Sequence, residues 1–128
     1  MALLLRHRPL DFHEAVPLTR TVIDSTAVDD HHVFPRGYLR DIGLENRIDT
    51  VLNHTLIDRE TNIRIQKKAP SVYLADIAEE LPNDLPRILD SHGLPSDPNG
   101  PLWNDDFDGF LEWRLQYLAD QLQGVTAE

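Results

Sequence analysis

The distribution of apolar and polar positions predicts strands in the first half of the chain and helices in the second. β-branched residues in TVIDSTAVDDHHVF, residues 21–34, favour a short strand that ends near Pro35. TVLNHTLID, residues 50–58, has the same character and predicts a second strand, with a break at Asn53 and His54. The connecting segments are less regular: residues 37–51 predict a short helix followed by a loop.

Helical spacing of apolar residues begins after the second strand. RETNIRIQKK, residues 59–68, is expected to form a helix with Asp58 as N-cap, and it must stop before Pro70. Residues 70–81 predict a helix with an apolar face made of Val72, Leu74, Ile77, Ala78 and Leu81. A shorter helix over residues 83–93 closes at Gly93.

The clearest helical pattern is NDDFDGFLEWRLQYLADQLQG, residues 104–124. Asn104 or Asp105 is expected to cap it, and Gly124 to end it. Its predicted buried stripe consists of Phe107, Phe110, Leu111, Leu115, Leu118 and Leu122.

The two halves of the chain differ in net charge. The net charge is −10, and residues 1–68 hold ten acidic and ten basic side chains, so they balance. Residues 69–128 hold 12 acidic side chains and two basic ones, Arg87 and Arg114. A polyanion such as DNA would be repelled by this half, and we expect unaided DNA binding to be weak and salt-sensitive.

The amino-acid composition limits which cellular compartments and which kinds of site are compatible with the chain. The chain has no cysteine, which excludes disulfides and thiolate metal sites and fits a reducing, cytoplasmic compartment. No apolar run approaches membrane-spanning length, and MALLLRHRPL lacks the long apolar region of a signal peptide. We therefore expect no membrane partner.

Four polar residues of the middle segment stand out as candidates for chemistry. His31 and His32 end the first strand, Asn53 lies at the second, and Asn62 lies one turn into the following helix. Strand, strand and helix carrying His, Asn and Asn is the layout of a ββα-metal site. A neutral imidazole suits a general base near neutral pH, and amide oxygens and imidazole nitrogens suit divalent cations.

These segments resemble HNH endonucleases, and more closely the C-terminal nuclease domain of GmrSD-type restriction endonucleases, which act on modified phage DNA. The resemblance extends over nearly the whole chain, including the lead-in LLLRHRPLDF. The strongest matches are HHVFPRGYL, LNHTLIDRETNIRIQKKAPSVYL, ILDSHGLP and FDGFLEWRLQYL.

The resemblance assigns a role to each candidate. The Phe-Pro landmark makes His32 the base, although an Asp30-His31 register would make it His31. His31 and Asn62 are then metal ligands, with Asp30 or Asp29 as substitutes for His31, and Asn53 orients the base. Phosphate contacts are expected from a set of basic residues: Arg36, Arg64, Lys67 and Lys68.

The implied fold class is α+β, a ββα-metal (HNH, His-Me finger) core with additional C-terminal helices. As one nuclease domain, residues 1–128 divide into a lead-in at 1–27, the core at 28–69 and an acidic helical cap at 70–128. One divalent cation is implied, Mg²⁺ or Mn²⁺ before Zn²⁺ or Ni²⁺. The substrate would be DNA, in a restriction or antiviral setting.

Targeting is expected from elsewhere, because family members carry an N-terminal ParB-like, nucleotide-hydrolysing sensor domain and this sequence has no Walker-type glycine-rich loop. Two alternatives stay open: a catalytically degenerate HNH-fold interaction module, and a hydrolase of RNA or free nucleotides. Among the other histidines, His7, His13 and His54 are expected at the surface, and His92 in a structural role at a helix end.

Overall fold

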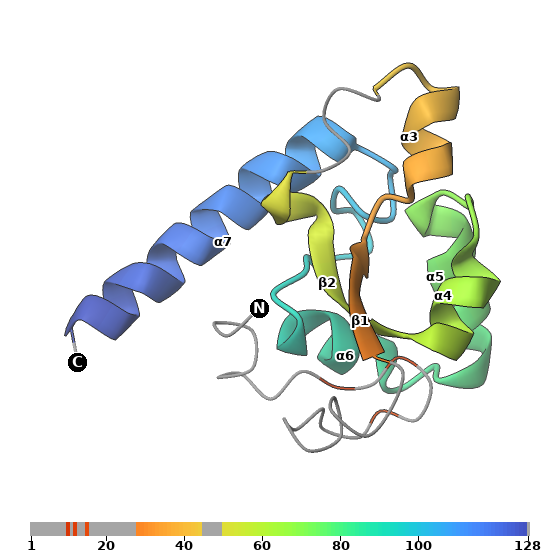
Figure 1. Ribbon diagram of the computed structural model, residues 1–128. Helices are drawn as coiled ribbons and strands as arrows, with labels where there is room; N and C mark the ends of the chain where they lie inside the picture. The colour runs from red at the N-terminus through yellow and green to blue at the C-terminus, as the bar shows by residue number, and fades with distance from the viewer. Residues whose placement is uncertain (1–9, 11, 13–14, 16–27, 45–49, 128) are drawn as a thin grey trace.

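The computed structural model describes residues 10, 12, 15, 28–44 and 50–127 (Figure 1). Within them the chain is a mixture of helices and one small antiparallel sheet, an α+β arrangement. The elements follow in the order β1 (Val28–His32), α3 (Arg36–Asp41), the 3₁₀ turn η2 (Val51–Asn53), β2 (His54–Asp58), α4 (Arg59–Ile65), α5 (Pro70–Glu80), α6 (Leu85–Ser91) and α7 (Phe107–Ala127).

The sheet has two strands, β1 and β2, whose register sets the site. Val28 pairs with Asp58 at one end and His32 with His54 at the other. The predicted break in the second strand is confirmed, because η2 occupies residues 51–53 and β2 starts at His54. The predicted N-cap role of Asp58 and the strand residues 21–27 lie outside the described residues or side chains.

The hydrophobic core lies between the sheet and the helices. Phe34 is fully buried just after β1, and its ring packs against those of Tyr38, Phe107 and Phe110. α4 lies beside α5 at the edge of the sheet, while α6 and α3 are at opposite ends of the molecule (Figure 1). The core is therefore assembled around the segment that immediately follows the two histidines.

Prolines and glycines set several helix ends as the sequence predicts. Pro70 occupies the first position of α5, where its missing N–H costs no hydrogen bond. Gly93 follows α6 with φ of +66°, the left-handed conformation that ends many helices. The buried face of α5, however, is Pro70, Tyr73, Leu74 and Ile77, and Val72 is 48% exposed rather than part of that face. The buried face therefore differs from the predicted one. The Tyr73 hydroxyl accounts for this, because it donates a hydrogen bond to the carbonyl of Val33 and so directs Tyr73 into the core.

Two expectations about α7, its cap and its end, are wrong, and a third is correct only in part. Its cap is Asp106, whose carboxylate accepts the Gly109 N–H at 3.1 Å. Asp105 instead binds the backbone N–H and hydroxyl of Ser71 at the start of α5. The helix also runs past Gly124 to Ala127.

The third expectation, the buried stripe of α7, holds for Phe107 and Phe110, and Leu111 also packs against the core. Phe107, Phe110 and Arg114 face the core, whereas Leu115 and Leu122 are 60% and 57% exposed. The first residues of α7 pack on the body and the rest of the helix extends beyond it (Figure 1). No helix in the described part of the chain is long and apolar enough to cross a membrane.

Candidate functional site

A polar cavity of 210 Å³ opens where β1 ends. Both histidines of the pair line it, together with Asn62 from α4, although α3, η2 and β2 separate the strand from the helix along the chain. Its full lining is His31, His32, Pro35, Arg36, Gly37, Asn62, Ile65 and Gln66. The structure thus brings together the predicted base, the two predicted metal ligands and one predicted phosphate contact.

Asn53 fixes the backbone that follows His32. Its Oδ1 accepts the Phe34 N–H at 2.7 Å, and its Nδ2 donates to the Phe34 carbonyl at 3.0 Å. The backbone carbonyl of Asn53 also accepts the Val33 N–H at 2.7 Å. Because Asn53 is fully buried, these bonds are shielded from water. Asn53 therefore acts on the strand end that carries His32.

Tyr73 completes this support from α5. Its hydroxyl donates to the Val33 carbonyl at 2.5 Å, and burial raises the pKa of the phenol well above its usual value. All four backbone polar groups of Val33 and Phe34 are then hydrogen-bonded inside the protein. A backbone bonded in this way restricts the position of the preceding residue, His32.

His54 is more closely involved than its predicted surface position suggests. It lies directly opposite His32 in the sheet, and the centroids of the two rings are 4.5 Å apart with an interplanar angle of 49°. Opposed residues of an antiparallel pair point to the same face, which is why the rings meet. His7 and His13 lie outside the described residues.

The four basic residues expected to contact phosphate are divided between two surfaces. Arg36 and Gly37 line the cavity. Lys67 lies beside Gly37, so close that a Cβ on Gly37 would collide with the Lys67 Cβ, and it is therefore next to the cavity. Lys67 forms an exposed ion pair with Asp41 at 3.7 Å, a kind of contact that contributes little to stability. Both remain near enough to the cavity to attract an anion.

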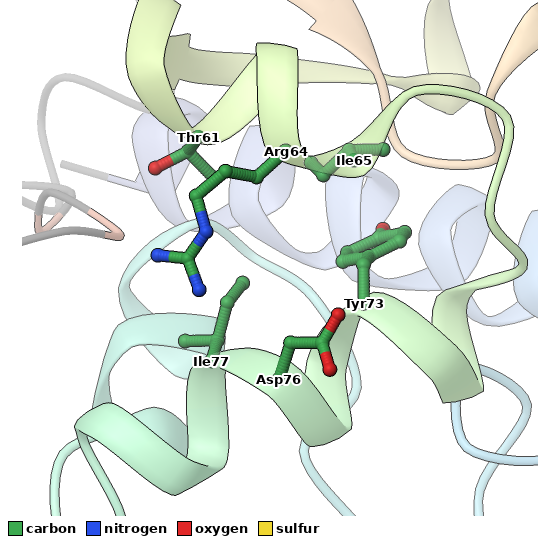
Figure 2. A pocket seen from close by; sticks show the side chains of 6 residues that line it. All are labelled: Thr61, Arg64, Ile65, Tyr73, Asp76 and Ile77. Atoms are coloured by element: carbon green, nitrogen blue, oxygen red, sulfur yellow. The ribbon is translucent and has the colours of Figure 1, made fainter.

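Arg64 and Lys68 face α5 instead. Arg64 binds Glu80 at 2.9 Å and Lys68 binds Asp76 at 3.2 Å. Figure 2 shows Arg64 extending from α4 toward Ile77 and Asp76 of α5. The space between them is only 10 Å³, room for about one water molecule, so it is no ligand site. A phosphate contact by these two residues stays a prediction.

The donor set of the cavity suits a divalent cation bound by few protein ligands. Two imidazoles and a carboxamide meet there. Among the described residues, no three His, Asp or Glu side chains form a metal-binding group, and the side chains of Asp29 and Asp30 are not described. Mn²⁺ fits this donor set better than Mg²⁺ does, because imidazole nitrogen is a poor ligand for Mg²⁺, and water and substrate oxygens would complete the coordination shell.

Two polar residues outside the cavity lining, His92 and Arg114, are fully buried. His92 is fully buried at the end of α6, where it contacts the Thr55 hydroxyl and the Leu10 carbonyl, each at 2.7 Å. Burial, with the nearby charge of Arg114, lowers the pKa of His92 to about 4. A neutral ring donating from Nε2 to Leu10 and accepting at Nδ1 satisfies both contacts. The structural role expected of His92 is confirmed.

Arg114 is the residue that sequence reasoning missed. It is 1% exposed and donates to the carbonyls of Leu52 and His92, each at 3.3 Å. It therefore joins α7 to η2, the turn that carries Asn53. A basic residue in an otherwise acidic half was the available signal, but it was assigned to charge rather than to the core.

Comparison with known proteins gives one informative relative. The chain is 31% identical, over 94% of its length, to an uncharacterized protein of Methanocaldococcus jannaschii, MJ0686. It spans only 24% of that protein. No family model matches the chain, and the comparison with solved structures found no match.

Proposed function

We propose that the chain is an HNH-type nuclease domain that hydrolyses phosphodiester bonds of DNA with one divalent cation. The observation that carries the proposal is the cavity in which His31, His32 and Asn62 meet. A ββα-metal core would have this composition: a two-stranded antiparallel sheet, a helix directly after it, and polar side chains where they adjoin.

In this proposal His32 is the general base. Its imidazole takes a proton from the water that attacks the phosphorus, a task for which imidazole is a common choice in enzymes. The new P–O bond replaces the bond to one sugar oxygen, and this leaving oxygen takes up a proton from solvent. Asn53 is a positioning residue, because it is fully buried and its carboxamide bonds the backbone of Phe34. A base held in one place loses less freedom when the substrate arrives, which favours the reaction.

His31 and Asn62 would hold the cation. When bound, it would supply positive charge to stabilise the charge that develops on the phosphate oxygens. Arg36, in the cavity wall, and Lys67, beside Gly37, would attract the DNA backbone. Arg64 and Lys68 could join them only by leaving their carboxylate partners on α5.

The acidic half of the chain implies that targeting comes from another source. Residues 69–128 carry 12 acidic and two basic side chains, which oppose association with DNA. A tethered sensor domain of the ParB-like type, or a partner protein, would overcome this by raising the local concentration of the nuclease on DNA. The proposed setting is restriction of foreign DNA in the cytoplasm.

The test is Mn²⁺ binding by calorimetry beside nicking of supercoiled plasmid. His32→Ala should reduce nicking by about 10²–10⁴-fold while Mn²⁺ still binds. Asn62→Ala should lose at least about tenfold in Mn²⁺ affinity as well as activity. Asn83→Ala, an exposed carboxamide between α5 and α6, is the matched control and should match the wild type.

The results that would contradict the proposal are as definite. A chain that neither binds Mn²⁺ nor nicks plasmid at micromolar concentration would be the degenerate interaction module. A chain that degrades structured RNA or free nucleotides in parallel digests, and leaves plasmid intact, would have a different substrate class.

A further inference from the structure

A second concave surface lies away from the histidine cavity. It is a groove of 260 Å³ between the end of α5, α6 and the segment leading to α7. Its wall is mostly apolar: Pro82, Leu85, Pro86, Leu89, Pro98 and Trp103. It shares no residue with the histidine cavity, and α6 and α3 lie at opposite ends of the molecule (Figure 1).

The size and stiffness of the groove indicate what fits it. Pockets that enclose a drug-sized molecule usually have about 300–1,000 Å³, so this groove is small for a cofactor and suited to one or two side chains. Three prolines, each with a fixed φ, form part of the wall. Leu85 and Leu89 belong to the core and hold the floor in place. The groove is therefore preformed, which lowers the entropic cost of binding.

The charges around the groove select the partner. Three carboxylates are adjacent in sequence to groove residues: Glu79 to Ala78, Asp84 to Leu85 and Asp97 to Pro98. Asp90 accepts a hydrogen bond from the groove residue Ser96 at 2.7 Å. Of the two basic residues of this half, Arg87 offsets Asp84 alone, to which it is paired at 2.7 Å, and Arg114 is buried, so Glu79, Asp90 and Asp97 keep the rim acidic.

We propose that this groove docks a short segment of a partner protein carrying one or two apolar side chains flanked by lysines or arginines. The apolar side chains would fill the groove beside Trp103, and the flanking cations would meet its carboxylate rim. Nucleic acid and anionic membrane are disfavoured by the same rim. The docked segment would leave the histidine cavity open, and the proposal does not depend on the nuclease activity.

The experiment uses Trp103 as the reporter. The chain has two tryptophans, and Trp113→Phe leaves Trp103 alone without altering the groove, because Trp113 lies on α7 against Tyr117. The probe is a short blocked peptide with two leucines between paired lysines. We expect a saturable change in Trp103 fluorescence, with a Kd on the order of 100 μM that weakens as salt is raised. The same peptide with glutamates in place of lysines should not bind.

Substitutions distinguish the contribution of the apolar groove to peptide binding from that of the carboxylate rim. Ser96→Phe, which fills the groove, should abolish binding, and Asp84→Asn combined with Asp97→Asn should weaken it at least about threefold. Asp120→Asn, an exposed carboxylate on α7, is the control and should bind like the parent. Thermal unfolding establishes whether each variant is folded. If Ser96→Phe does not fold, the variant that combines Asp84→Asn with Asp97→Asn still tests the proposal.

Three outcomes would overturn the proposal. The first is an unchanged Trp103 spectrum at millimolar lysine peptide. The second is equal binding of the glutamate and lysine peptides, or unchanged binding of the lysine peptide by the variant that combines Asp84→Asn with Asp97→Asn. The third is a Trp103 signal that depends on protein concentration, with a dimer in sedimentation that Ser96→Phe abolishes, since the occupant would then be a second copy.

Discussion

Replacement of Asn53 by alanine is the most informative single perturbation of this structure. The carboxamide makes two hydrogen bonds to the backbone of Phe34, at 2.7 and 3.0 Å, and both residues are fully buried. Asn53→Ala leaves a buried N–H and a buried carbonyl without these partners. Each such loss costs about 1–3 kcal/mol, so the free energy of unfolding should fall by about 2–6 kcal/mol.

A loss of this size is a large part of the total, since domains of this kind are stable by about 5–15 kcal/mol. For a chain of 128 residues it should lower the Tm by about 10–20 °C. The assay is thermal and urea unfolding followed by circular dichroism. Amide exchange at Phe34 should accelerate, because its N–H has lost its acceptor.

Asn62→Ala is the matched control for this prediction. Asn62 is half-buried and lines the cavity, so its removal should change stability by no more than about 1 kcal/mol while it weakens Mn²⁺ binding. A Tm for Asn53→Ala within about 2 °C of the wild type would refute the role given to Asn53, as would an equal loss of stability in the two variants.

Three further predictions test other parts of the structure. The pKa of His92 is lowered to about 4, so its contribution to stability, about 3 kcal/mol, is complete above pH 6.5 and is lost as the pH falls toward 4. The stability gap between wild type and His92→Gln in urea should therefore narrow over that range, and a constant gap would exclude a buried neutral ring. Gly93→Ala should cost about 1–3 kcal/mol more than Gly43→Ala, because both have positive φ but only the first new Cβ meets the ring of Tyr117; equal costs in calorimetry would contradict this. Leu115→Gln should change stability by less than about 0.5 kcal/mol and Phe110→Ala should cost about 3–5 kcal/mol, and a large loss for Leu115→Gln would restore the predicted leucine stripe to the core.

Local signals in the sequence were sufficient for most elements. β-branched residues predicted the described strands, and Pro70 and Gly93 predicted the ends of helices, because these residues act through their own backbone geometry. The order of His31, His32 and Asn62 along the chain also predicted a shared cavity, because a helix that directly follows an antiparallel strand pair packs beside it.

Which side of a helix is buried was harder to predict. In α7 the leucines form a stripe as regular as the one that is buried, and the choice is made by distant groups. Arg114 reaches the carbonyls of Leu52 and His92, which no local pattern encodes. The orientation of the Arg64 and Lys68 side chains could not be predicted for the same reason. It is set by ion pairs with carboxylates of α5, which lie elsewhere in the sequence.

The claim on which the functional account rests is that His31 and Asn62 hold one cation beside His32. The most direct test is an anomalous difference map from crystals grown with Mn²⁺. The account predicts one strong peak in the cavity, bound by His31 and Asn62, and its loss in Asn62→Ala crystals. A peak bound elsewhere, or an empty cavity at saturating Mn²⁺, would contradict it.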